Sequence, residues 1–222
     1  MSFRSVIIFG GDSEPGDRVT MKALANGLDV VSVVRGRRAT DGPKRNGLAT
    51  TLCEPADRDS VERVFADRRG EGFAVVAILG GSPQVNSQGN IHVINAAAAA
   101  GVRRLVLTTS IGCGDSAAVI DPFVKAVAGR AIRAKEWAEN HLRTTDLDWT
   151  IVRAGGTTRR PGTGTAILTD SKVVTGYISL TDLGDMLWLA LTSPATHGRA
   201  LAAVDSARAF NIDGSPVRPV EL

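Results

Sequence analysis

A glycine-rich turn is the segment of this sequence whose residue types and spacing point most directly to chemistry. In VIIFGGDSEPGDRV (residues 6–19), an apolar run leads into the turn, and Gly10, Ser13 and Gly16 occupy the three positions of a G-x-x-G-x-x-G frame. In mononucleotide-binding folds such glycines allow a tight turn, let the backbone approach a pyrophosphate and let the following helix pack on the strand. The turn therefore predicts a dinucleotide site. The alternative is that the strand-turn-helix start needs these glycines only in order to fold.

Two acidic residues, Asp12 and Glu14, stand in this turn where a pyrophosphate would bind. A carboxylate about 5 Å from a phosphate oxygen costs roughly 1 kcal/mol in a water-like medium and about 3 kcal/mol at an effective dielectric constant of 20. One such acid would weaken binding about five- to a hundredfold. Either carboxylate could also cap the helix and take the place of the bound anion. Alternatively, both side chains point into solvent, and the site works.

Basic residues follow the second apolar run, DVVSVV (29–34). Arg35 stands at the end of this run, where an acid selects NAD and a base accommodates the 2′-phosphate of NADP. Arg38 follows shortly after, and further basic residues add to the charge: Arg37, Lys44 and Arg45. The pattern predicts NADP as the cofactor, with Arg35 and Arg38 at its 2′-phosphate. A solvated basic loop is the alternative.

The segment SIGCGDS (110–116) carries two further reactive side chains, Cys113 and Asp115. The segment follows an apolar run, so it should lie at the carboxyl edge of a parallel sheet, where sites in open α/β folds form. Asp115 is therefore a candidate acid or base, with loop capping as the alternative. Cys113 has no histidine nearby in the sequence and is expected to be a small buried residue. The three histidines show no metal-ligand spacing, so no metal site is predicted.

The elements that must position these residues alternate between apolar runs and helical patterns. The apolar runs are 5–10, 29–34, 48–53, 73–79, 104–110 and 148–153, and the helical patterns are 16–27, 57–68, 88–100 and 121–143. Nearly continuous apolar runs are typical of parallel strands buried on both faces. The sequence therefore predicts an α/β fold with a doubly wound, Rossmann-like parallel sheet.

The region after residue 154 is rich in glycine, proline and threonine, and no linker separates it from the rest. Residues 1–222 are therefore expected to form one domain, in which about 154–180 make a small substrate-side lobe. Short strands at 166–168 and 172–175 are expected to pair with each other. A helix at 181–192 and a strand at 199–204 should complete the fold.

Composition narrows the range of partners. A net charge of +3 with scattered Lys and Arg, and no series of aromatic residues for base stacking, argues against a nucleic-acid partner. Two cysteines are too few for a disulfide framework or a zinc site. No apolar stretch approaches the length of a membrane span, and the start MSFRSVIIFGG lacks a signal-peptide cleavage region. These features predict a cytoplasmic protein without a membrane partner.

With strands, turn and spacing placed, the chain resembles the atypical short-chain dehydrogenases/reductases of the NAD(P)-binding, NmrA-like type. Within them it is most similar to the small single-domain group that includes biliverdin reductase B and flavin reductase. The most specific segments are NAAAAAGVRRLVLTTSIGCGDS (95–116) and AKEWAENHLRTTDLDWTIVRAGG (134–156), and the resemblance runs from residue 5 to about 204. It is specific for the fold but says little about the substrate.

The resemblance implies several cofactor contacts. Glu54 stands where relatives place an Asp near the adenine amino group, and Gly80 in LGG (79–81) stands where the fourth strand passes the ribose. Packing of a helix on the sheet would explain these glycines equally well. Ala154 in VRAGG (152–156) belongs to the segment that lines the nicotinamide, where the family has Arg-Pro-Gly-Gly.

The resemblance also implies catalytic roles. Ser110 would polarise a substrate carbonyl, and Lys135, the Lys of a Tyr-x-x-x-Lys motif, would hold the nicotinamide ribose. A backbone-bonded Ser and a surface Lys are the alternatives. Ala131 replaces the Tyr of the motif, so a proton must come from water or another group. In a further departure, Leu180 stands where an Arg is common.

Together these features predict an enzyme, an NADP-dependent reductase of a small apolar or aromatic substrate. The departures from the family pattern keep alternatives open: a non-redox descendant of the fold, such as a cyclase, isomerase or lyase, or a protein that binds NADP to sense it. The helical patterns at 88–100 and 121–143 are long enough to pair in a homodimer.

Overall fold

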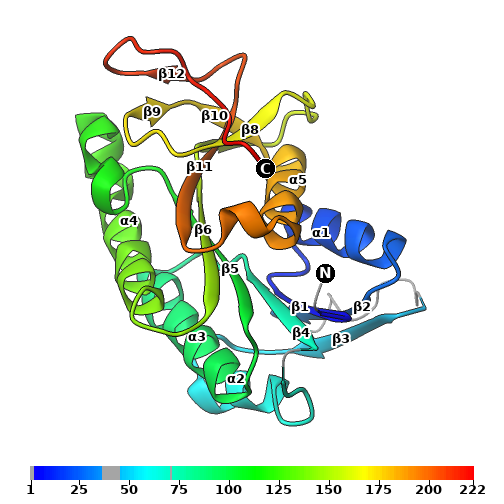
Figure 1. Cartoon of the computed structure of the whole chain (residues 1–222). Coiled ribbons are helices and arrows are strands. Elements are labelled where there is room, and N and C mark those ends of the chain that lie inside the picture. The colour runs from blue at the N-terminus through cyan, green and yellow to red at the C-terminus, as the bar shows by residue number, and fades with distance from the viewer. Residues whose placement is uncertain (1–2, 37–45, 71) are drawn as a thin grey trace.

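The computed structural model describes residues 3–36, 46–70 and 72–222. Its centre is an eight-stranded sheet in the order β3-β2-β1-β4-β5-β6-β11-β8, and every strand pair is parallel except β11 with β8 (Figure 1). The strands are β1 (Ser5–Phe9), β2 (Asp29–Val34), β3 (Leu48–Leu52), β4 (Phe73–Ala77), β5 (Arg104–Ser110), β6 (Asp148–Ala154), β8 (Ala166–Thr169) and β11 (Arg199–Asp205). The order reverses between β1 and β4, as in a doubly wound nucleotide-binding fold, so the prediction of the fold class is confirmed.

Helices cover both faces of this sheet (Figure 1). They are α1 (Glu14–Ala25), α2 (Arg58–Val64), α3 (Asn90–Ala99), α4 (Pro122–Leu142) and α5 (Leu180–Thr192), with a π-helical turn η2 (Val85–Gly89) leading into α3 and 3₁₀ turns η3 (Gly114–Val119) and η4 (Pro194–Thr196). Successive residues of β1 explain the two layers, because Ile7 and Phe9 pack with α2, α3 and α4, whereas Val6 and Ile8 pack with α1 and α5. A strand buried on both faces needs such a continuous apolar run.

Several helix boundaries agree with their local signals. Asp57 caps α2 by accepting a hydrogen bond from the amide of Asp59, and Gly101 follows the end of α3 with φ of 74°. Helix α2 ends at Val64, before the predicted 68, and Phe65 is its C-terminal cap. The three expected apolar contacts of this helix, Val61, Val64 and Phe65, are buried.

The lobe after β6 is where the sequence-based assignment is partly wrong. The two expected short strands exist as β8 and β9 (Val174–Thr175), but they do not pair with each other. Strand β8 joins the edge of the main sheet on β11, and β9 pairs with β12 (Phe210–Asn211). Strands β7 (Gly156–Thr158) and β10 (Tyr177–Ser179) form a small parallel pair. Each new partner is distant in sequence, so no local pattern could reveal the pairing.

Candidate active site

Two cavities lie at the carboxyl ends of the parallel strands. The first has a volume of about 340 Å³ and is lined by residues at or after the ends of β1, β2, β3 and β4, which are Phe9, Gly10, Asp12, Ser13, Val33, Val34, Arg35, Cys53, Pro55, Ile78, Leu79, Gly80 and Gly81. We call it the glycine-turn cavity. It lies at the point where the strand order reverses, which is where open α/β sheets bind nucleotides.

The glycine turn is built from Gly10, Gly11 and Gly16. Gly10 has φ of 82°, a β-carbon on Gly11 would lie 2.1 Å from the Ser32 hydroxyl oxygen, and one on Gly16 would lie 2.3 Å from the Gly10 carbonyl oxygen. Side chains at these three positions would clash with their neighbours, so the tight turn depends on glycine. The predicted frame is correct at its two outer positions, and Gly11 is the close-packed glycine between them.

Ser13 occupies the middle position of the frame, where a glycine would let the backbone approach the phosphates, but here it caps a helix. Its hydroxyl donates to the Gly10 carbonyl at 2.6 Å and accepts from the Gly16 amide at 3.2 Å, which makes it the N-terminal cap of α1. The expected alternative of an acidic cap is therefore wrong, because the serine oxygen already satisfies this amide. The amides of Asp12 and Glu14 find no acceptor among the described residues, and they remain as donors for an anion.

The two acids of the turn are held in different places. The Glu14 carboxylate accepts a 2.7 Å hydrogen bond from the Thr181 hydroxyl in the first turn of α5, and Glu14 does not line the glycine-turn cavity. Asp12 does line it and is exposed. No hydrogen bond or ion pair of the Asp12 side chain occurs within the described part of the chain. One acid, rather than two, therefore faces the place predicted for the pyrophosphate.

Arg35 crosses the cavity from β2 toward β4. Its Nη2 atom donates to the Gly80 carbonyl at 3.2 Å, and its guanidinium lies 3.6 Å from the point where a Gly81 side chain would begin. A side chain at Gly80 would meet no atom within 4 Å, so the cavity is open there. These contacts leave room for a nucleotide beside Arg35, and the residues present fit one. Arg38, like Arg37, Lys44 and Arg45, lies outside the described residues.

Glu54 lies beside this cavity and not in its lining, which contains its neighbours Cys53 and Pro55. The Glu54 side chain is exposed and accepts a 3.4 Å hydrogen bond from the Ala56 amide. Its predicted contact with an adenine amino group stays a prediction.

The second cavity, of about 430 Å³, lies between the ends of β5 and β6, helix α4 and the lobe. Its lining residues are Ser110, Ile111, Val119, Ile120, Asp121, Val124, Ala128, Ala131, Ile132, Lys135, Ala154, Gly155, Gly156, Thr175, Gly176, Tyr177, Arg208 and Phe210. We call it the lobe cavity. It brings together Ser110, Lys135 and Ala154, which the family resemblance places around a nicotinamide. The register pairs Ser110 of β5 directly with Ala154 of β6.

The two candidate catalytic side chains of the lobe cavity are both half-buried. The Ser110 hydroxyl donates to the carbonyl of Ile111 at 3.0 Å, a weak local bond that a ligand oxygen can replace. Burial lowers the pKa of the Lys135 ammonium, whereas the nearby Cys113 and Glu139 act in the opposite direction. Within the described residues, the Lys135 ammonium has no hydrogen-bond or ion-pair partner, so its donors are available to a ligand.

A buried ion pair stands behind Ser110 and Lys135. The Glu139 carboxylate, 1% exposed, accepts bonds from Arg153 at 2.7 and 3.1 Å and from the Thr109 hydroxyl at 2.6 Å. Thr109 and Arg153 directly precede Ser110 and Ala154, and Glu139 lies one helical turn after Lys135. The pair therefore ties α4 to both strands that carry the site. One feature of the sequence indicates this ion pair: a charged residue, Arg153, lies within the otherwise mostly apolar strand DWTIVRA and must find a partner when the strand is buried.

Asp115 does not line the lobe cavity, and its electrostatic environment opposes a role as a proton donor. Burial raises the pKa of its carboxyl, but hydrogen bonds from Arg153 and Lys172 outweigh this effect and lower the pKa to about 2. Lys172 lies 2.9 Å away and Arg153 is in direct contact. Asp115 is thus an ionised structural anchor in this arrangement. Cys113 is buried, as expected of a small buried residue, and burial raises the pKa of its thiol to about 12.

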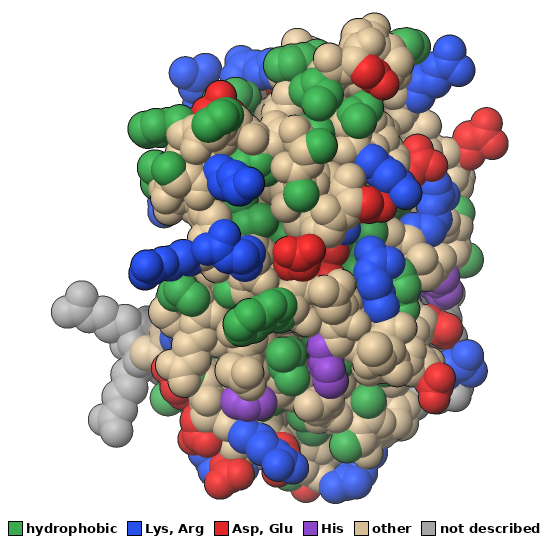
Figure 2. Space-filling model, turned by 90° about the vertical axis from the view of Figure 1, so that its left-hand side faces the viewer, with side chains coloured by type: hydrophobic (Ala, Val, Ile, Leu, Met, Phe, Trp, Pro, Cys, Tyr) green, Lys and Arg blue, Asp and Glu red, His purple; other side chains and the backbone are tan. Residues whose placement is uncertain are grey.

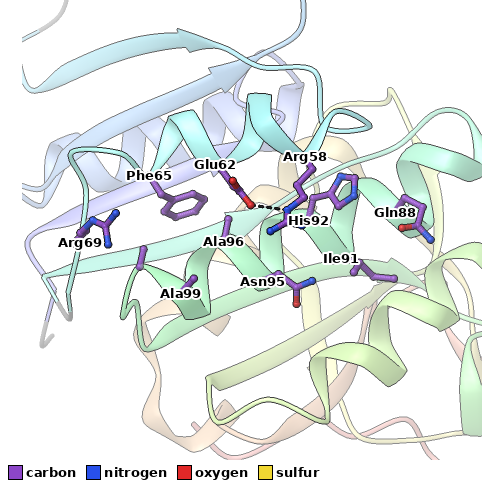
Figure 3. Close-up of a pocket in the computed structure, with 11 residues that line it drawn as sticks. Arg58, Glu62, Phe65, Arg69, Gln88, Ile91, His92, Asn95, Ala96 and Ala99 are labelled. Atoms are coloured by element: carbon purple, nitrogen blue, oxygen red, sulfur yellow. Dashed lines mark hydrogen bonds and ion pairs between the residues drawn. The ribbon is translucent and has the colours of Figure 1, made fainter.

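A larger hollow, of about 730 Å³, lies elsewhere, in a groove between α2 and α3 (Figure 3). Figure 3 shows Arg69 and Phe65 toward one end of the groove, the Arg58–Glu62 ion pair near its middle, and Gln88 toward the other end. The groove has no glycine turn, lies away from the carboxyl ends of the strands, and holds none of the predicted site residues. We therefore place the chemistry in the two cavities described above.

The exposed face of α4 is notable for its apolar side chains. Phe123, Val127 and Trp137 are 75%, 74% and 63% exposed. Figure 2 shows the side of the molecule on which α4 lies, with apolar side chains interspersed with charged ones.

None of the described helices is long and apolar enough to span a membrane. No cluster of three His, Cys, Asp or Glu that could hold a metal occurs among residues 3–36, 46–70 and 72–222.

Comparisons with known proteins agree with this fold. ChuY from Escherichia coli O157:H7, described as an anaerobillin reductase, superposes with a TM-score of 0.82 at 27% identity, over 90% of this chain and 97% of that one. A putative NAD-dependent epimerase/dehydratase from Bacillus halodurans shares the fold, with a TM-score of 0.76 at 21% identity over 91% of this chain and 94% of its own. The UPF0659 protein C216.03 of Schizosaccharomyces pombe is 27% identical over 195 residues, 78% of this chain and 76% of that protein.

The family assignment rests on a match that covers most of the chain. Residues 10–194, from the glycine turn to just beyond the end of α5, match the model of the NAD(P)H-binding family. This agrees with the resemblance to atypical short-chain dehydrogenases/reductases that the sequence motifs indicate. The chain therefore belongs to the NAD(P)H-binding family.

Proposed function

We propose that this protein is an NADP-dependent reductase of a small apolar or aromatic substrate. The observation that carries the proposal is the lobe cavity, in which Ser110, Lys135 and Ala154 converge beside mostly apolar walls. A bound nicotinamide cofactor would supply a hydride. The glycine-turn cavity and the lobe cavity lie along the same sheet edge, so an extended dinucleotide has a place at both.

The residues of the lobe cavity would orient the reactants. The Ser110 hydroxyl would turn from the Ile111 carbonyl to donate to a substrate oxygen and so stabilise negative charge that develops there. The Lys135 ammonium would donate to ribose hydroxyls. Ala131 lines the cavity where the family's tyrosine would stand, so the proton would come from water.

Arg35 supports NADP over NAD. Its guanidinium is anchored to Gly80 by one bond at 3.2 Å, which leaves its other donors for a phosphate. A charge-assisted contact of this kind is worth about 1.5–3 kcal/mol. Arg38 would add a second contact.

Titration of the protein with NADPH, followed by nicotinamide fluorescence, tests the proposal. We expect saturable binding, and consumption of NADPH when a substrate is added, with anaerobillin as the first compound to assay because ChuY is described as its reductase. Lys135→Met should lower turnover strongly, whereas the exposed Lys125→Met on the same helix should not. Absence of binding at millimolar NADPH would overturn the proposal.

A second candidate function keeps the fold but not the hydride transfer. It is favoured by the position of Asp12 in the glycine-turn cavity and by the engagement of Ser13 with the turn itself. In that case the lobe cavity would serve a cyclisation, isomerisation or lyase step, or NADP would be bound without turnover. Activity that persists after all nucleotide has been removed would favour the non-redox enzyme, and NADPH binding without consumption would favour the sensor.

A further inference from the structure

We infer that the lobe cavity selects a flat substrate that carries a carboxylate, with Arg208 as the residue that binds this group. The inference builds on the proposed function, because it concerns the substrate of the same site. It rests on three features of the described residues: two exposed aromatic rings in the cavity lining, an arginine with unused donors between them in the sequence, and a lining with more cations than anions.

The aromatic rings are those of Tyr177 and Phe210, 59% and 60% exposed. Both line the lobe cavity together with apolar residues such as Ile111, Ile120 and Ile132. Large apolar surface left open to water in a cavity is typical of a ligand site. Aromatic side chains favour flat partners, because rings stack in offset or edge-on arrangements.

Two glycines explain why these residues meet. A β-carbon on Gly156 would lie 2.7 Å from the Tyr177 ring, and one on Gly176 would lie 2.9 Å from the Ala209 α-carbon. The missing side chains let the Tyr177 ring lie on β7 and let the segment that carries Arg208 and Phe210 approach β10. The close approach therefore assembles both rings and the arginine into one lining.

Arg208 is the cation of this lining that stands two residues before Phe210. Arg208 forms a long ion pair with Asp205, in which its Nε atom lies 3.8 Å from the carboxylate oxygen, beyond hydrogen-bond distance, and its side chain is 48% exposed. Asp205 is satisfied by others, since it accepts from the Thr165 hydroxyl at 2.6 Å and the Ala207 amide at 3.1 Å. Within the described residues, the guanidinium of Arg208 makes no hydrogen bond.

The charges around the cavity favour an anion. The titratable residues of its lining, apart from Tyr177, are Arg208, Lys135 and Asp121. The carboxylate of Asp121 already caps α4, because it accepts the Phe123 amide at 2.8 Å. A small neighbouring notch shares Tyr177 and Arg208 with the lobe cavity and adds one cation, Arg160, and one anion, Asp205. The planar fork of a guanidinium matches the two oxygens of a carboxylate, so a carboxylate is the anion we assign.

A pair of probes that differ only in charge tests this inference. Naphthoate and naphthamide share one flat ring system, and their binding is measured by calorimetry on the cofactor-free protein. We expect naphthoate to bind at least about tenfold more tightly, because only the acid forms charge-assisted hydrogen bonds. Arg208→Gln should abolish this preference, and Arg208→Lys should keep part of it. Arg218→Gln removes the same charge from an exposed position outside the cavity and should change nothing.

Three results would overturn the inference: equal affinity for the two probes, no binding of naphthoate at millimolar concentration, or a preference that Lys135→Met abolishes and Arg208→Gln does not. Failure of the proposed function gives a different pattern. In that case NADPH does not bind, whereas the preference for naphthoate and its dependence on Arg208 persist.

Discussion

The position of Asp12 leads to a sharp prediction about cofactor affinity. Asp12 lines the glycine-turn cavity and is exposed, whereas Glu14 is held by Thr181 and does not line it. A carboxylate about 5 Å from a phosphate oxygen costs roughly 1–3 kcal/mol, depending on the effective dielectric constant. Asp12→Asn removes this repulsion with little change in shape. We therefore expect NADPH to bind about five- to a hundredfold more tightly to this variant.

Glu14→Gln is the matched control, because it removes the same charge from the neighbouring residue outside the cavity. Its effect on the dissociation constant should be clearly smaller than that of Asp12→Asn, because the Glu14 carboxylate is held by the Thr181 hydroxyl and does not line the cavity. Affinity is measured by nicotinamide fluorescence at low and high salt. The gain from Asp12→Asn should shrink as salt rises.

An Asp12→Asn variant with unchanged affinity would refute this reasoning, as would a Glu14→Gln variant with an equal gain. The first result would mean that the carboxylate turns into solvent when the cofactor binds. Adding Ser13→Gly is a further step, because it removes the hydroxyl that bonds to Gly10 and Gly16. Any extra gain would report on how closely the backbone approaches the phosphates.

Four further predictions concern stability, pH, selectivity and assembly. Glu139→Ala should lower the free energy of unfolding in urea by about 3–5 kcal/mol, because it removes the buried partner of Arg153 and leaves only the half-exposed Asp115 to pair with it, and a loss below about 1 kcal/mol would contradict this. Folding lowers the pKa of Asp115 from 3.8 to about 2, so the ionised carboxylate should stabilise the fold fully above pH 3.8 and progressively less toward pH 2. The difference in thermal midpoint between the unmodified protein and Asp115→Asn should therefore vanish as the pH falls over that range. Arg35→Ala should weaken NADPH binding about tenfold or more and leave NADH binding nearly unchanged, and an equal loss for both would remove Arg35 from the 2′-phosphate. Val127→Glu should convert a homodimer that pairs through α4 into monomers by light scattering, and a monomeric unmodified protein would exclude that dimer.

The lobe shows where local signals stop being informative. Strands β7, β9, β10 and β12 have two or three residues each, too few for a hydrophobic period, and their partners lie far along the chain. These strands and their flanking residues include Tyr177, Arg208 and Phe210, so no local pattern connects these three residues with the site. Ser110 and Lys135 are predicted from the sequence because they stand in segments with recognisable motifs.

The sequence by itself determined the doubly wound sheet, the glycine turn and most element boundaries. Each of these depends on local properties: continuous apolar runs for buried strands, helical spacing of apolar residues, and glycine where the backbone has no room for a side chain. Only the tertiary structure decided what the acids of the turn do. Glu14 is drawn to a hydroxyl 167 residues away, on Thr181, while Asp12 stays at the cavity. Both are acidic residues of one exposed turn, and the direction of each side chain follows from partners that only folding brings near.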